Sequence, residues 1–395
     1  MKAEVLREFD GYEDVVRAIE LSRIHGVDYT PDKDSPEPYI RRLHPPSLHL
    51  QIQDLFVETP STKTFRLVSR DGPLPPFQAG QYISLVVDVG AVRTSRPYSI
   101  SSPPNHLGHY DVTVRRYPDG LVSNHLLDHA RKGDVLEATG PAGEFYHNPL
   151  FHSKHMVLIA GGCGITPFRS MIREILECGL DRTIHLFYGN RDAEDVIFHE
   201  EFLDLAARFD RFHYIPVLEN PPPSYPGRTG LITGKLLREI LGDLEDKTFY
   251  VCGPQGLYDF CIPELETLGI PRRKLRREVY GTPSDIRRSP GWPAGLDPDT
   301  PVAVKVNGGK PLATRAGEPL LACLERHRIA VPSSCRSGSC SLCRVKVLAG
   351  RVYQPPGALV RKSDRKHGLS TPACPTPWKT SIFLCDSGPQ TETAA

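Results

Sequence analysis

Towards its C-terminal end the chain contains Cys335-Arg-Ser-Gly-Ser-Cys340-Ser-Leu-Cys343, and a further cysteine, Cys374, follows well downstream. Three thiolates within nine residues can surround one cluster only from a loop that folds around it. Such a loop requires small residues, which its serines and glycine supply. The C-x4-C-x2-C spacing with a remote fourth cysteine therefore predicts a [2Fe-2S] cluster bound by Cys335, Cys340, Cys343 and Cys374.

Two other uses of these cysteines fit the sequence less well. A structural zinc site prefers two short C-x2-C pairs, whereas this chain has one short pair and a longer first gap. Disulfides would require an export signal, and the first eight residues contain no apolar core. The scattered cysteines are expected to be free thiols in a reducing cytoplasm, namely Cys163, Cys178, Cys252, Cys261, Cys323 and Cys385.

The cysteine loop, with Arg-Val-Lys-Val after it at positions 344–347, closely resembles the plant-type ferredoxins. The resemblance implies a C-terminal ferredoxin domain with the α+β β-grasp fold over residues 301–390. Cys385 is the nearest alternative to Cys374 as fourth ligand. Cys374 is preferred because Ala-Cys-Pro-Thr-Pro at positions 373–377 is similar to the ferredoxin segment that delivers the last thiolate.

Length and composition restrict the remaining possibilities. With 395 residues, 39% of them hydrophobic, the chain can bury more than one core, so two or three domains are expected. A net charge of +1 gives no argument for nucleic-acid binding, and no apolar run approaches the roughly 18 residues of a membrane span. We therefore expect a soluble, cytoplasmic protein.

The chain changes character along its length. Residues 1–46 are an N-terminal extension whose acidic residues argue against a transit peptide, with one helix expected at residues 12–24. Short alternating strands with proline and glycine punctuation in residues 47–150 indicate an antiparallel β-barrel, with the clearest strands at residues 64–68, 81–87 and 110–115. Residues 151–282 alternate apolar strands with helices, which indicates an α/β domain with a parallel sheet, its strands at residues 155–160, 185–188 and 248–251. A proline- and charge-rich tether, residues 283–300, leads to the cluster domain.

The barrel contains Arg96-Pro97-Tyr98-Ser99, which resembles the R-x-Y-S flavin motif of the ferredoxin-NADP reductase superfamily. Segments similar to the family precede this motif at residues 77–82 and follow it at residues 120–124 and 140–145, in the family's order. The resemblance implies FAD rather than FMN, bound by Arg96, Pro97, Tyr98, Ser99, Val114, Arg115, Gly120, Leu121, Val122 and Ser123.

The chemistry of the side chains explains the role expected of each flavin-binding residue. Arg96 and the amides around Val122 and Ser123 would hold the pyrophosphate. Tyr98 would stack on the flavin, and the Ser99 hydroxyl would hydrogen-bond the ring edge near the reactive nitrogen. The structural alternative is that Tyr98 is a barrel-core aromatic and Arg96 belongs to a surface ion pair.

The next domain opens with Gly161-Gly162-Cys163-Gly164-Ile165-Thr166-Pro167, in which a strand runs through glycines into a helix. Glycines let the backbone approach a pyrophosphate, Thr166 is expected to cap the following helix, and Pro167 suits its first position. The helix, residues 168–177, is expected to end at Cys178-Gly179. The turn is similar to the nucleotide site of the same superfamily, in which Thr166 would lie close to nicotinamide and flavin.

A second segment, Cys252-Gly253-Pro254, resembles the C-G-P segment of the same superfamily, whose cysteine lies beside the nicotinamide carbon that gives up hydride. Leucine or glycine stands where the family usually has methionine. Cys252 would then position the coenzyme; the alternative is a small buried hydrophobe at a strand end. Glu278 and Tyr280 match the acidic and aromatic residues that often end this domain near the flavin in the same superfamily. With the residues expected beside the flavin and the nicotinamide, this gives four candidate catalytic residues: Ser99, Thr166, Cys252 and Glu278.

The choice of coenzyme depends on Asn190, Arg191 and Asp192, at the end of the second parallel strand. A carboxylate favours the ribose hydroxyl of NADH, whereas an arginine accommodates the extra phosphate of NADPH. Both types are present. NADPH is weakly preferred because Arg191 comes first and can contact a phosphate in bidentate fashion.

The domain order resembles the reductase components of oxygenases and hydroxylases, such as those of phenylacetyl-CoA epoxidase and steroid hydroxylases. It implies electron flow from NAD(P)H through FAD and [2Fe-2S] to a protein acceptor, with an oxygenase or hydroxylase expected. An electron-transfer subunit of a larger complex and a noncatalytic redox sensor are the alternatives. Two basic runs, residues 272–277 and 361–366, are candidates for docking an acidic partner.

Overall fold

The computed structural model describes residues 11–25, 40, 43–278, 281, 285–329, 331–340, 342–355, 358, 360–370, 376–377 and 379–385. The chain divides into two compact units, residues 1–45 and 46–395. In the first unit, α2 (Tyr12–His25) coincides with the helix expected at residues 12–24. Glu13 and Asp14 lie in its first turn, where negative charge favours the helix dipole.

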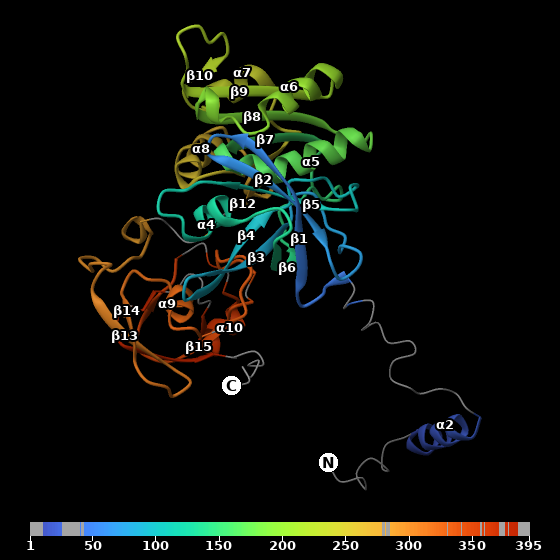
Figure 1. Cartoon of the computed structure of the whole chain (residues 1–395), viewed down its shortest axis with the longest axis vertical. Coiled ribbons are helices and arrows are strands. Elements are labelled where there is room, and N and C mark those ends of the chain that lie inside the picture. The colour runs from blue at the N-terminus through green and yellow to red at the C-terminus, as the bar shows by residue number, and fades with distance from the viewer. Residues whose placement is uncertain are drawn as a thin grey trace. The chain divides into compact units, whose positions relative to one another are not determined.

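The second unit begins with a six-stranded antiparallel sheet in the order β4-β3-β6-β1-β2-β5 (Figure 1). An antiparallel bridge between Ile100 and Val112 joins the end of β4 to β5 and closes the predicted barrel. The expected strands fall on β2, β3 and β5. The elements are β1 (Leu48–Thr59), β2 (Thr62–Ser69), β3 (Tyr82–Val89), β4 (Val92–Ser99), β5 (Tyr110–Arg115), α4 (Leu121–His129) and β6 (Val135–Ala142).

The second domain is a parallel sheet in the order β10-β9-β8-β7-β11-β12, as the alternation of strands and helices predicts. Its strands are β7 (His155–Gly161), β8 (Thr183–Asp192), β9 (Phe212–Asn220), β10 (Arg228–Thr229), β11 (Thr248–Cys252) and β12 (Leu275–Glu278). Because β8 and β11 flank β7 on opposite sides, the strand order reverses there. Ligands of open α/β sheets bind at the carboxyl ends of strands at such a point.

Helices and short turns connect these strands. They are η1 (Gly162–Ile165), α5 (Thr166–Glu177), η2 (Ala193–Asp195), α6 (His199–Arg208), α7 (Gly234–Leu241), α8 (Gln255–Thr267) and η3 (Arg272–Lys274). Gly179 ends α5 as expected: its φ is +63°, its N–H donates to Leu176 O, and Leu180 N–H donates to Ile175 O. This pair of bonds is the Schellman motif, in which glycine carries no Cβ penalty.

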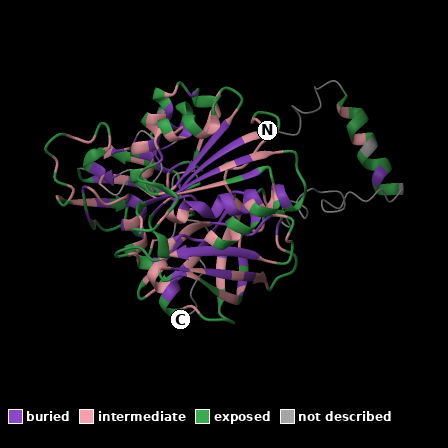
Figure 2. Ribbon diagram, turned by 90° about the horizontal axis from the view of Figure 1, so that it is seen from above, coloured by how far each residue is buried: buried purple, intermediate pink, exposed green. Residues whose placement is uncertain are grey.

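Helix α5 joins the nucleotide and flavin domains through a shared core. Phe168 and Phe145 pack with ring centroids 5.7 Å apart, and Ala79 of the flavin domain belongs to the same buried cluster. Ser170 Oγ also donates to Ser102 O at 2.7 Å. Figure 2 shows buried residues along the strands. The shared cluster shows that these two domains are held by apolar packing as well as by hydrogen bonds.

The C-terminal domain has a five-stranded sheet in the order β14-β13-β19-β15-β17, with β13 and β19 parallel and the other pairs antiparallel. Helix α9 buries Leu320 and Leu324 against Val304 and Phe383 of this sheet. This is the predicted β-grasp arrangement. Its elements are β13 (Pro301–Val306), β14 (Leu312–Arg315), α9 (Leu320–Arg326), β15 (Val345–Ala349), β16 (Val352–Tyr353), α10 (Lys362–Lys366), β17 (Leu369–Ser370), β18 (Thr376–Pro377) and β19 (Ser381–Cys385).

The segment expected as a tether packs on the C-terminal domain where the structure describes it. It contains the short helix η4 (Ile286–Arg288). Trp292 meets Tyr353 edge to face with centroids 5.1 Å apart, and Tyr353 Oη donates to Pro290 O at 2.9 Å. The Arg315 guanidinium pairs with Asp299 at 2.8 Å. These contacts reduce the length of chain that can move freely between the domains.

None of the helices in the described part of the chain combines the length and apolar character that crossing a membrane requires.

Candidate redox site

The glycine turn after β7 lies at the carboxyl edge of the parallel sheet, where the sequence predicts a phosphate site. Gly162 has φ +50°, and its carbonyl oxygen accepts a hydrogen bond from Tyr188 Oη at 2.9 Å. The turn continues through η1 directly into α5, so Thr166 is already helical, and its hydroxyl donates to Cys163 O at 3.1 Å. The expected role of Thr166 as a side-chain cap is therefore wrong, and Pro167 is the second residue of the helix.

The two nucleotide motifs touch each other. A Cβ on Gly164 would lie 2.1 Å from the carbonyl oxygen of Cys252, and one on Gly161 would lie 3.1 Å from Pro254 Cδ. Gly253 is equally close to Gly161. Only glycines allow the two backbones to approach in this way, which is what a turn shaped around a pyrophosphate needs.

Cys252 and Glu278 lie side by side at the ends of β11 and β12. Cys252 is fully buried in the core of the sheet, which fits the structural alternative, and its contact with nicotinamide stays a prediction. Burial raises the pKa of the Glu278 carboxyl to about 8, and negative charge on the neighbouring Cys335 sulfur acts in the same direction. Glu278 thus lies between the nucleotide edge and the cluster loop, while Tyr280 lies outside the described residues.

The flavin motif occupies the end of β4. Arg96 Nη1 donates to Thr94 Oγ1 and to Ser95 O, both at 2.7 Å, and no described carboxylate forms an ion pair with Arg96. Burial lowers the pKa of its guanidinium. Tyr98 is half-buried against the barrel core and Ser99 is buried. A partly buried arginine without an acidic partner fits a bound phosphate better than the surface ion pair.

Helix α4 presents the second part of the flavin site. Its N-cap residue, Gly120, provides no side-chain cap, so the first-turn N–H groups of Leu121, Val122 and Ser123 remain available to an anion. A Cβ on Gly120 would lie 2.3 Å from Ser123 Oγ, which can rotate, and 3.1 Å from Tyr117 O, so the space beside this glycine is tight. The side chains of Val122 and Val114 are buried in the barrel core, which leaves only their backbones for a ligand.

Arg115 connects the flavin and nucleotide domains. Its guanidinium pairs with Asp195, which also accepts a hydrogen bond from Ser61 Oγ at 2.7 Å. A Cβ on Gly162 would lie 2.6 Å from Arg115 Nη1, so this arginine lies against the glycine turn. Contact of Arg115 with FAD stays a prediction.

The residues predicted to select the coenzyme, Asn190, Arg191 and Asp192, end β8. Both polar atoms of the Asn190 amide are buried and form no well-aligned hydrogen bond with any described group. Arg191 and Asp192 are exposed, and Asp192 Oδ1 accepts from Asn220 Nδ2 at 3.3 Å. Arg191 forms no ion pair within the described chain. A buried amide without a well-aligned partner and an exposed cation suit a polar, anionic ligand at this edge.

The cluster loop brings Cys335 and Cys340 together. Cys340 N–H donates to Cys335 Sγ at 3.3 Å, and hydrogen bonding from the Cys340 thiol, opposed by burial, lowers the pKa of Cys335. Cys343 is buried beside Leu321 and Ala358. Cys374 lies outside the described residues, and within them no three His, Cys, Asp or Glu side chains converge as a metal site would require.

The donor set of this loop suits an iron-sulfur cluster. Thiol ligands and N–H groups directed at sulfur are what such clusters use. Arg336 and Gly338 adopt left-handed backbone conformations, with φ of +54° and +81°, which turn the chain sharply between the cysteines. The rival ligand Cys385 packs into the domain core beside Val304 and Phe383.

The cluster loop rests on the flavin domain. Ser84 Oγ on β3 donates to Ser334 O at 2.9 Å, and Ser334 Oγ donates to Tyr82 Oη at 3.3 Å. Helix α9 lies beside β4, as Figure 1 also shows. Ser334, the residue before Cys335, is therefore held against β3, while α9 lies against β4, the strand that contains the flavin motif.

The two basic runs belong to different domains, and the second is linked to the strand that leaves the cluster loop. Residues 272–277 form η3 and β12 in the nucleotide domain. In the other run, Arg361, Lys362 and Lys366 are exposed, and the pair between Arg344 and Asp364 at 3.4 Å holds α10 beside the strand that leaves the loop. Exposed positive charge thus lies in the same domain as the exposed Cys340, a predicted cluster ligand.

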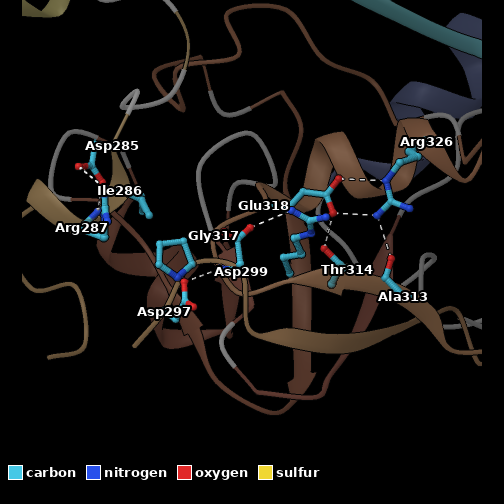
Figure 3. A pocket seen from close by; sticks show the side chains of 12 residues that line it. Asp285, Ile286, Arg287, Asp297, Asp299, Ala313, Thr314, Gly317, Glu318 and Arg326 are labelled. Carbon is cyan, nitrogen blue, oxygen red and sulfur yellow. Dashed lines mark hydrogen bonds and ion pairs between the residues drawn. The ribbon is translucent and has the colours of Figure 1, made fainter. Parts of the chain in front are cut away.

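A surface cavity of about 870 Å³ lies elsewhere, between the tether and the C-terminal domain (Figure 3). Its arginines each pair with a carboxylate: Arg287 with Asp285, Arg315 with Asp299, and Arg326 with Glu318. Because these charges are compensated, the cavity offers little to an ionic ligand. It takes no part in the redox site.

Family models match all three domains. An oxidoreductase FAD-binding domain matches residues 51–147, an oxidoreductase NAD-binding domain residues 158–262, and a 2Fe-2S iron-sulfur cluster binding domain residues 304–379. FAD, a pyridine nucleotide and a [2Fe-2S] cluster are therefore the cofactors of this fold, as the sequence predicts.

Several relatives match this chain over most of their own length. The glycine betaine monooxygenase reductase subunit of Pseudomonas aeruginosa is 27% identical, over 81% of this chain and 90% of the relative. The NADH oxidoreductase HCR of Escherichia coli is 31% identical, over 76% of this chain and 86% of the relative. The solved structure of phthalate dioxygenase reductase is 25% identical and superposes with a TM-score of 0.63, over 86% of this chain and 98% of that one.

Proposed function

Because this chain belongs to the ferredoxin-NADP reductase superfamily, in the group with a C-terminal 2Fe-2S domain, we propose that it is the reductase component of an oxygenase system. It is an NAD(P)H-dependent flavin and iron-sulfur oxidoreductase. The finer proposal concerns its acceptor, a separate oxygenase protein that receives electrons from the cluster.

The observation that carries this proposal is that the flavin domain touches both of its neighbours at their functional loops. Arg115 of the flavin domain lies against the Gly162 turn on one side. Strand β3 holds the Cys335 loop on the other, through Ser84 and Tyr82. This placement favours a chain of three sites within one protein.

Different residues would bind each of the three cofactors. Gly161, Gly162 and Gly164 shape the turn that would bind the pyrophosphate of NAD(P)H. Arg96 and the first turn of α4 would hold that of FAD, and the thiols of Cys335, Cys340, Cys343 and Cys374 would hold the cluster. When bound, FAD converts a two-electron hydride into single electrons, which a [2Fe-2S] cluster carries one at a time. No described residue needs to act as a general acid or base on this route.

The relatives support a separate acceptor, because two of them are named as a reductase subunit of a monooxygenase and as the reductase of a dioxygenase. We place the docking face at exposed Cys340 and the basic residues Arg361, Lys362 and Lys366. We also place the protein in the cytoplasm, where its cysteines, none of which forms a disulfide in the described chain, stay reduced.

The proposal is tested by purifying the protein and supplying NADH or NADPH. Flavin and [2Fe-2S] absorbance should appear together, and ferricyanide and cytochrome c should both be reduced. Oxygenase turnover by a purified partner component should then depend on this chain. Cofactor-loaded protein that oxidises no pyridine nucleotide would instead indicate the redox sensor.

Coenzyme preference gives a specific prediction. Arg191→Ala should lower kcat/KM for NADPH by roughly tenfold and leave NADH within about twofold, because the exposed Arg191 side chain would contact the phosphate that only NADPH carries. Steady-state ferricyanide reduction with each coenzyme measures this. Arg208→Ala, which removes an exposed arginine paired with Asp204 on α6, is the control. Equal effects on both coenzymes would assign Arg191 to a group that NADH shares.

A further inference from the structure

Four side chains link the flavin motif to the cluster loop through hydrogen bonds. Arg96 Nη1 donates to Thr94 Oγ1 at 2.7 Å, and Thr94 Oγ1 donates to Glu325 Oε2 at 3.0 Å. Glu325 also accepts two bonds from Arg336, at 2.5 and 2.8 Å. The chain of contacts thus runs from the arginine proposed to hold FAD to the residue that follows the cluster ligand Cys335.

The Glu325 carboxylate is the charged centre of this junction. It belongs to α9 of the ferredoxin domain and forms a bidentate pair with Arg336, which adds geometric definition to the ion pair. Its bond to Thr94 crosses to β4 of the flavin domain. The other hydrogen bonds described between these two domains, through Ser84, Ser95 and Ser334, join neutral groups.

Because the junction is buried, the loss of one of its hydrogen-bond partners would be costly. Thr94 is 4% exposed and Arg336 is 9% exposed, so water cannot easily replace a lost partner. Removing the carboxylate would leave the Arg336 guanidinium buried without its partner, close to Arg96 on the opposite side of the interface. Two like charges would then face each other, and separating the domains would relieve both problems.

We propose that Glu325 is a positioning residue that docks the ferredoxin domain on the flavin domain through Thr94 and thereby sets the rate of electron transfer from FAD to the cluster. The inference rests on the proposed function. It adds that α9, which contributes no cluster ligand, fixes the place of the cluster loop, and that the same threonine hydroxyl serves the flavin arginine. A small displacement of the docked domain is then enough to slow transfer.

The test uses Glu325→Ala and Thr94→Val in the full-length, cofactor-loaded protein. Thr94→Ser, which keeps the hydroxyl, is the rescue variant. Thr314→Val is the matched control, because Thr314 is also buried and donates to a glutamate, Glu318 at 2.6 Å, but within the ferredoxin domain. The readouts are flavin and iron content, ferricyanide and cytochrome c reduction, and the radius of gyration from small-angle X-ray scattering.

Glu325→Ala should lower cytochrome c reduction by roughly tenfold, with ferricyanide reduction within about twofold of the wild-type rate. Thr94→Val should lower the ratio of cytochrome c to ferricyanide reduction by a similar factor, measured per bound flavin because Thr94 also accepts a hydrogen bond from Arg96. The radius of gyration should rise in both, while Thr94→Ser and Thr314→Val stay like the wild type. Unchanged cytochrome c reduction in Glu325→Ala, equal loss of both activities, or loss of flavin from that variant would each overturn the inference. A wild-type protein that reduces neither dye would instead contradict the proposed function.

Discussion

Cys340→Ser is expected to abolish NAD(P)H-dependent reduction of cytochrome c while sparing much of the reduction of ferricyanide. Cys340 is the exposed cysteine of the loop, and its thiol and N–H are both directed at Cys335 Sγ. Serine cannot supply the thiolate that the cluster needs. Ferricyanide can take electrons before the cluster, in the flavin domain, which this substitution does not touch. Parallel dye assays on flavin-replete protein measure the difference.

The control for this experiment is Cys178→Ser, which changes another exposed cysteine, at the end of α5 in the nucleotide domain. It should keep both activities and the full iron content. If Cys340→Ser lost ferricyanide and cytochrome c reduction equally while folded and flavin-replete, the order of electron flow proposed for this protein would be wrong.

Gly164→Ala is expected to lower kcat/KM for NAD(P)H by more than tenfold with either dye as acceptor. The added Cβ would lie 2.1 Å from Cys252 O and 2.6 Å from Gly253 Cα, and both contacts are to backbone. Because backbone cannot rotate away as a flexible side chain can, the two turns that form the nucleotide site must separate. Steady-state kinetics and coenzyme titration of the flavin-loaded protein test this.

Gly256→Ala is the matched control, since this glycine lies on α8 close to the same turn and a Cβ there would meet nothing within 4 Å. It should leave the kinetics unchanged and stabilise the helix slightly. Equal effects of the two substitutions would show that the close approach of Gly164 to Cys252 does not shape the nucleotide site.

The architecture was largely predictable because it depends on local patterns. Alternating apolar strands and helices predicted the parallel sheet of residues 151–282, and period-two strands predicted the barrel. Local signals were less reliable at element ends. Threonine is a residue type that often caps helices, yet η1 continues directly into α5, so Thr166 is already helical and cannot adopt the extended backbone of an N-cap. The proline-rich tether packs through Trp292 and Tyr353, which composition alone does not reveal.

The sequence by itself determined the chemistry of this protein, because a cluster or a phosphate is recognised by a few residues at short, fixed spacing, as in Cys335 to Cys343 and Gly161 to Gly164. Only the tertiary structure decided how the sites connect. The bonds from Thr94 to Glu325 and from Arg115 to Asp195 join residues 231 and 80 positions apart. No periodicity or motif marks such pairs, since each residue alone is an ordinary polar group, and their partners are chosen by how the three domains pack.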